Sequence, residues 1–104
     1  MSIFHLTEDN FDEITGEGIS LLDFWAAWCA PCRALAPAVE ELAGKLDGKV
    51  RVCKVDVDAE PKLAERFGVF SIPTIVAMSD GAEFNRGVGV MPVEELEALV
   101  SVEV

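Results

Sequence analysis

The sequence predicts a single α/β domain with a mixed β-sheet, parallel at its centre and antiparallel at an edge hairpin, flanked by about four helices. Three observations carry this prediction. Strand-like and helix-like segments alternate along nearly all of the 104 residues. Residues 19–25 are almost continuously apolar, as in a strand that is covered on both faces. Ser79-Asp80-Gly81 is a hairpin signal between two strand-like segments.

The N-terminal part of the chain contributes the first three predicted elements. A short strand covers 3–6, and a helix follows over 8–14. Gly16 and Gly18 end this helix, because glycine is a poor helix former. The apolar strand over 19–25 comes next, and its composition places it at the centre of the sheet.

A longer amphipathic helix is predicted after residue 30. Pro31 suits its first turn, since proline has a fixed φ and no N–H group to leave unpaired. Apolar residues then recur at helical spacing with charged residues between them. This apolar stripe consists of Leu35, Val39, Leu42 and Leu46.

The second half of the chain alternates in the same way. The predicted elements are a strand over 50–57, a helix over 61–67, strands over 74–78 and 82–88, and a helix that begins at Pro92. Gly68 closes the first of these helices. The order of the elements therefore continues the α/β pattern to the C-terminus.

Composition agrees with one globular domain over residues 1–104. The chain is 51% hydrophobic and carries a net charge of −11, which disfavours nucleic-acid binding because phosphates are repelled. The first ten residues include Glu8 and Asp9 and show no basic region followed by an apolar one, so no secretory signal is expected. No apolar run approaches the ~20 residues that span a bilayer. We expect a cytoplasmic protein without membrane contacts.

Two cysteines, Cys29 and Cys32, stand where the apolar strand gives way to the long helix. Residues three apart become neighbours in a helix, so a disulfide can close between them. Cys29 lies at the helix N-terminus, where unpaired N–H groups and the macrodipole favour an anion, whereas Cys32 falls near the apolar stripe. The spacing predicts a redox site with Cys29 as the reachable attacking thiolate and Cys32 as the buried resolving thiol.

A structural zinc site is the alternative interpretation of this cysteine spacing. Tetrahedral zinc needs four ligands, and the available set is Cys29, Cys32, Cys53 and His5. We expect no metal. Cys53 lies in an apolar strand and is interpreted as a small core residue rather than a regulatory thiol, and His5 as a solvated strand residue.

The segment from Leu22 to Arg33, which reads LDFWAAWCAPCR, is similar to the active-site segment of the thioredoxin family. The likeness extends over nearly the whole chain. Further matches are Pro37, Lys54-Val55-Asp56-Val57-Asp58, Phe67-Gly68-Val69, Ile72-Pro73-Thr74, Asp80-Gly81 and Gly89. The resemblance implies the thioredoxin fold and a dithiol–disulfide cycle of Cys29 and Cys32 that needs no other cofactor.

Asp23 interrupts the apolar strand, where a buried carboxyl should have a raised pKa. An exposed carboxylate at a strand edge is the alternative. In the family, the matching carboxyl helps to move protons to and from the inner sulfur, so the resemblance implies a catalytic role for Asp23. It also suggests that Lys54 faces Asp23, although an ordinary surface lysine is equally compatible with the sequence.

The resemblance further implies a groove for an extended peptide. Pro73 matches the family's cis-proline, which packs against the disulfide, but only about one X-Pro bond in twenty is cis, so a plain turn proline is the alternative. Ile72 would exchange main-chain hydrogen bonds with the substrate. The expected groove residues are Trp28, Pro31, Ile72, Pro73, Gly89 and Val90.

Ala30 departs from the family, whose members usually carry glycine there. Alanine favours a helix by about 1 kcal/mol, which corresponds to tens of millivolts at most for a two-electron couple. A typical reductant and a typical isomerase differ by roughly 90 mV. We therefore expect Ala30 to support the site without changing the direction of the reaction.

The resemblance implies a monomeric thiol-disulfide oxidoreductase that reduces protein disulfides and serves electron transport and cell redox homeostasis. Regeneration would fall to a thioredoxin reductase, because the chain has no G-x-G-x-x-G dinucleotide fingerprint of its own. Two alternatives remain open: a disulfide oxidase or isomerase, and a non-catalytic binding module. The residues between Cys29 and Cys32 include no histidine, which favours a reductant over an oxidant.

Overall fold

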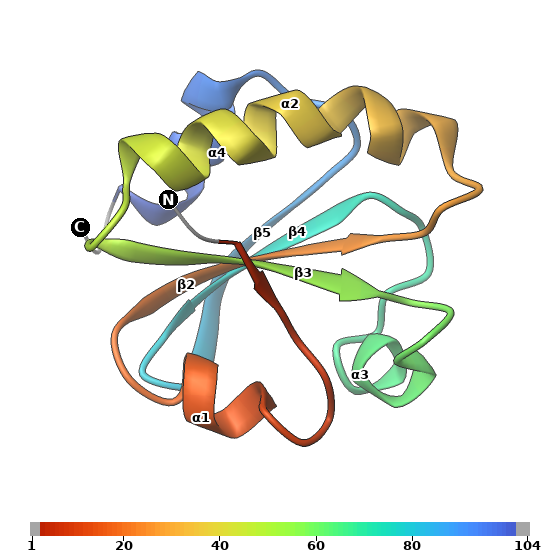
Figure 1. Ribbon diagram of the computed structural model, residues 1–104, viewed down its shortest axis with the longest axis horizontal. Coiled ribbons are helices and arrows are strands. Elements are labelled where there is room, and N and C mark those ends of the chain that lie inside the picture. Colours follow the sequence, from red (N-terminus) through yellow and green to blue (C-terminus); the bar gives the residue numbers. More distant parts are fainter. Residues whose placement is uncertain (1–2, 102–104) are drawn as a thin grey trace.

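The computed structural model describes residues 3–101, and strands alternate with helices along the chain as predicted (Figure 1). The strands are β1 (Phe4–His5), β2 (Ile19–Trp25), β3 (Val50–Asp56), β4 (Thr74–Ser79) and β5 (Ala82–Val88). The helices are α1 (Phe11–Thr15), α2 (Ala30–Lys45), α3 (Pro61–Arg66) and α4 (Val93–Val100). None of the helices in this described part is long and apolar enough to span a membrane.

The five strands form one mixed sheet in the order β1-β3-β2-β4-β5. Strand β2 lies at its centre, parallel to β3 and antiparallel to β4. Strands β4 and β5 form the predicted antiparallel hairpin. Its turn places Asp80 at φ 48° and Gly81 at φ 85°, and two positive φ values match the right-handed twist of the flanking strands.

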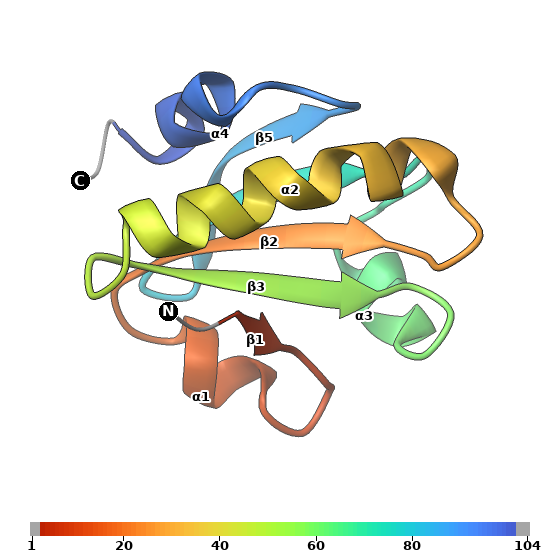
Figure 2. The same ribbon diagram turned by 45° about the horizontal axis from the view of Figure 1, so that its top comes forward.

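Helices cover both faces of the sheet. Figures 1 and 2 show α2 and α4 on one face and α1 and α3 on the other. Side chains of a strand alternate between the faces: Leu21 packs in the α2/α4 core, whereas Leu22 and Phe24 pack in the α1/α3 core. This double burial explains the continuous apolar run of β2, and it fixes the face toward which Asp23 points.

Several boundaries differ from the predicted ones. Helix α1 begins at Phe11 rather than at residue 8, because Thr7 and Asn10 close a turn first. The Thr7 N–H donates to Asn10 Oδ1 at 2.7 Å, and the Asn10 N–H donates to Thr7 Oγ1 at 3.2 Å. Strand β1 is only two residues long. The last helix starts at Val93, with Pro92 as its N-cap.

Candidate active site

Cys29 and Cys32 form a disulfide at the N-terminus of α2, with their Cα atoms 5.3 Å apart. Cys29 is the N-cap of this helix and has an extended backbone, which turns its side chain toward the first helical turn. The Cys32 N–H donates to Cys29 Sγ at 3.2 Å. The sulfur of Cys29 therefore occupies the position in which a helix N-terminus stabilises an anion.

Exposure does not distinguish the two cysteines in this oxidised form. Each is only 3% exposed, so Cys32 is buried as predicted, whereas Cys29 in the disulfide is not reachable, contrary to the prediction. Ala26 packs against the pair, and the half-buried Val57 and Ile72 cover it from outside the helix. What distinguishes the two sulfur atoms is the hydrogen bond that Cys29 Sγ accepts from the Cys32 N–H in the first turn of the helix.

The loop before β4 lies against the disulfide. The Ile72–Pro73 peptide bond is cis, as the resemblance implied, and Pro73 is buried. The Ile72 carbonyl oxygen lies 3.7 Å from Cys29 Sγ. The Pro73 carbonyl accepts a hydrogen bond from the Gly89 N–H at 2.9 Å. This bond brings the segment after β5 beside the loop that contacts the disulfide.

The residues expected to form the groove surround this point and differ in exposure. Trp28 is 68% exposed and Val90 is 56% exposed, while Pro31 is exposed and Ile72 and Gly89 are half-buried. Gly89 has a φ of 96°, a conformation that L side chains rarely adopt. Apolar surface is thus available next to Cys29 on α2 and beside the Pro73 loop.

Asp58 is a neighbour of the site that the sequence analysis did not identify. Its Oδ2 accepts a hydrogen bond of 2.8 Å from the Trp28 indole N–H. This bond holds the large exposed ring beside Cys29. The sequence marks the segment that contains Asp58 only as a match to the family, and no local pattern links residues thirty positions apart.

Asp23 is buried in β2, only 1% exposed, which rules out an exposed strand-edge carboxylate. It lies opposite Lys54 in the parallel register of β2 and β3. Burial raises the pKa of Asp23 to about 6, and the positive charge of Lys54 opposes this rise. Neither carboxylate oxygen accepts a hydrogen bond from the protein groups described between residues 3 and 101.

Lys54 is half-buried rather than freely exposed, and its Nζ lies 5.0 Å from the centre of the Trp25 ring. Trp25 in turn packs against the disulfide. Cation–π contact with Trp25 and the charge of Asp23 both favour this position of the ammonium group. Asp23, Lys54 and Trp25 thus connect the centre of the sheet to the redox pair.

Cys53 lies apart from this site. It is fully buried in β3 among Leu22, Phe24 and Val55, and burial raises the pKa of its thiol to about 12. His5 is exposed in β1. Across residues 3–101, no three or more His, Cys, Asp or Glu side chains are grouped to hold a metal ion.

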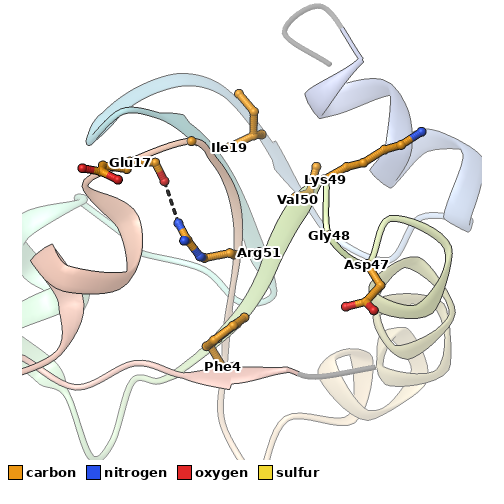
Figure 3. Close-up of a pocket in the computed structure, with 9 residues that line it drawn as sticks. Phe4, Glu17, Ile19, Asp47, Gly48, Lys49, Val50 and Arg51 are labelled. Atoms are coloured by element: carbon orange, nitrogen blue, oxygen red, sulfur yellow. Dashed lines mark hydrogen bonds between the residues drawn. The ribbon is translucent and has the colours of Figure 1, made fainter.

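A cavity of about 490 Å³ lies at the opposite end of the sheet, where β2 and β3 begin (Figure 3). The Arg51 guanidinium group at its wall donates to the carbonyl oxygens of Glu17 at 2.7 Å and Ile14 at 3.2 Å. Figure 3 shows the carboxylates of Glu17 and Asp47 on different sides of the cavity. The labelled charged groups do not converge on a common point.

The comparison with known proteins agrees with this geometry. The thioredoxin family model matches residues 2–102. The chain is 45% identical over 100 residues to the thioredoxin of Staphylococcus saprophyticus, with 96% of each chain covered, and 48% identical over 96 residues to that of Staphylococcus haemolyticus, with 92% of each covered. It is 42% identical over 101 residues to the thioredoxin of Bacillus subtilis, with 97% of each chain covered. The chain therefore belongs to the thioredoxin family of protein-disulfide oxidoreductases, and its redox pair is Cys29–Cys32.

Proposed function

We propose that Cys29 is the nucleophile of the reduced protein and that Cys32 resolves the intermediate. The observation that carries this assignment is the hydrogen bond from the Cys32 N–H to Cys29 Sγ at the N-terminus of α2. An N–H donor and the helix macrodipole stabilise a thiolate at that atom. Cys32 lies inside the first helical turn, within reach of Cys29 Sγ.

The cycle consists of two exchanges. The Cys29 thiolate attacks one sulfur of a target disulfide, which forms a mixed disulfide and releases the other target sulfur as a thiolate. The Cys32 thiolate then attacks Cys29 Sγ and displaces the second target sulfur. The target gains two electrons and two protons, and Cys29 and Cys32 become the disulfide seen in the structure.

Asp23 acts in the second exchange by accepting the proton that Cys32 must lose. Its raised pKa of about 6 supports this role, because a base is most effective when its pKa lies near the working pH. Lys54 faces Asp23 and tempers the rise of this pKa. Asp23 is on the sheet face that α2 covers, the same face as Leu21.

The target binds as an extended peptide across the Pro73 loop. The main chain of Ile72 pairs with it, as in strand addition, because the Ile72 carbonyl lies beside Cys29 Sγ. The apolar surfaces around this point provide side-chain contacts. These surfaces belong to Trp28, Pro31, Ile72, Gly89 and Val90, with Ala30 at the start of the helix, whereas the buried Pro73 shapes the loop.

The remaining part of the proposal concerns the setting of the reaction. Residues 1–104 act as one monomeric thioredoxin domain in the cytoplasm, with the Cys29–Cys32 pair as its redox group. A thioredoxin reductase returns the pair to the dithiol after each turnover. Support for this part comes from membership of the family.

Replacement of each cysteine tests the assignment. Cys29→Ser should abolish reduction of a disulfide-containing model protein in a reductase-coupled assay, whereas Cys32→Ser should accumulate a mixed disulfide with the target. Cys53→Ala is the matched control, because Cys53 is buried away from the site, and it should retain turnover. An adduct trapped on Cys32 in the Cys29→Ser protein would reverse the roles, and unchanged biological activity of this variant would indicate a binding module.

A further inference from the structure

The loop that reaches the disulfide carries an exposed aromatic side chain that has no role in the mechanism above. Phe70 is 98% exposed and lies in the loop between α3 and β4, two residues before Ile72. Trp28 and Val90 are also exposed large apolar residues, and both belong to the proposed groove. Phe70 therefore adds exposed apolar surface to the loop that carries Ile72 and Pro73.

The backbone before Phe70 is firmly held. The Phe67 ring packs against the rings of Phe11 and Phe24, each at a centroid distance of 5.6 Å. The Phe67 carbonyl accepts a hydrogen bond of 2.8 Å from Arg86 Nη2, and Glu83 holds this guanidinium group through bonds of 2.7 and 2.8 Å. A side chain on such a fixed segment can be contacted with little further loss of backbone entropy.

The segment after Phe70 is anchored at the disulfide. Ile72 packs in the cluster around the cysteine pair, and its carbonyl oxygen lies 3.7 Å from Cys29 Sγ. The Val69 N–H donates to the Ala64 carbonyl at 2.9 Å on the other side. Phe70 is thus presented to solvent between two fixed points, and one of them contacts the reacting sulfur.

We propose that Phe70 is a specificity-determining residue that contacts an apolar side chain of the target within about three residues of its attacked cysteine. The inference rests on the proposed function and on the pairing of the target with Ile72. The Cα atoms of Phe70 and Ile72 are two residues apart and therefore lie within roughly 8 Å of each other, a distance that two to three residues of an extended target peptide span. No charged residue lies in the loop over 67–73, which makes an apolar side chain the matching partner.

Two matched peptide disulfides test this contact. One carries leucine at the second and third positions on both sides of the target cysteine, and the other carries serine at these positions. For Phe70→Ala, kcat/KM for the leucine peptide should fall about tenfold, equivalent to about 1.4 kcal/mol of lost contact. The serine peptide and a small aromatic disulfide should change less than about twofold, since neither offers the apolar contact.

Two control variants distinguish the loss of the Phe70 side-chain contact from a change in the conformation of the loop. Ser71→Ala alters the adjacent exposed side chain and should leave kcat/KM unchanged for both peptides. Phe70→Leu keeps an apolar side chain at position 70 and should retain most of the preference for the leucine peptide. An equal loss on both peptides in Phe70→Ala would overturn the inference, because it would indicate a change in the loop. So would sedimentation showing a dimer that Phe70→Ala abolishes while peptide kinetics stay unchanged. Failure of the unaltered protein to reduce either peptide would instead overturn the proposed function, and this inference with it.

Discussion

Substitution of Asp23 by asparagine should stabilise the protein in a way that depends on pH. In the folded protein, burial raises the pKa of Asp23 from 3.8 to about 6. Between these two values the folded state binds more protons than the unfolded state, so the free energy of unfolding falls as the pH rises. Above pH 6 the full cost of the buried charge applies. At 1.36 kcal/mol per pH unit, this cost is about 3 kcal/mol at pH 7.

Asparagine has nearly the same shape as a protonated aspartate and cannot ionise. The oxidised Asp23→Asn protein should therefore match the unaltered protein near pH 3.5 and exceed it by about 3 kcal/mol at pH 7. Urea unfolding at several pH values measures this difference. Reductase-coupled turnover at pH 7 should fall in the same variant, because the proton acceptor for Cys32 is lost.

Asp47→Asn is a suitable control, because Asp47 is exposed, and its effect on stability should stay within about 0.5 kcal/mol. A free-energy difference between Asp23→Asn and the unaltered protein that does not change from pH 3.5 to pH 7 would refute the reasoning about burial. Unchanged turnover in Asp23→Asn would refute the proton role of the carboxyl while leaving its burial intact.

Three further predictions concern residues around the site and in the core. Lys54→Met removes the positive charge that faces Asp23 and should raise the pKa of that carboxyl above about 6. NMR titration of the carboxyl would measure this pKa, and an unchanged or lower value would contradict the pairing of Lys54 with Asp23. In the reduced native protein, iodoacetamide at pH 8 should modify Cys29 much faster than Cys53, because Cys53 is buried with a pKa of about 12; mass spectrometry of the peptides would show equal modification if this burial were wrong. Leu42→Ala should lower the free energy of unfolding by about 2–5 kcal/mol, since Leu42 is fully buried in the α2/α4 core, and a loss below about 1 kcal/mol would contradict tight packing there.

Strand β2 could be predicted to the residue, because burial on both faces leaves a nearly continuous apolar run that ends shortly before the cysteine pair. The burial of Asp23 followed from the same pattern. The start of α1 could not be predicted, because mutual hydrogen bonds between Thr7 and Asn10 delay the helix. Such a turn depends on side-chain geometry that periodicity does not report.

Within the site, long-range packing accounts for what the sequence did not reveal. Cys29 is covered in the oxidised protein by Val57 and Ile72, which are distant in the chain, so its position at a helix end overstated its exposure. The Trp28–Asp58 hydrogen bond could not be predicted for the same reason, because it joins two loops that are distant in the chain. The exposure of Phe70 could not be predicted either, because the presence of an apolar residue in a loop does not indicate whether its side chain is buried or exposed.

We propose that Cys29 and Cys32 form a reducing pair whose dithiol donates electrons to target disulfides. Equilibration of the protein with thiol–disulfide buffers of known potential, followed by alkylation of the free thiols, measures the potential of this pair. We expect a redox potential of about −270 mV, shifted by no more than a few tens of millivolts by Ala30. A value near −120 mV, roughly that of a strong disulfide oxidant, would contradict it.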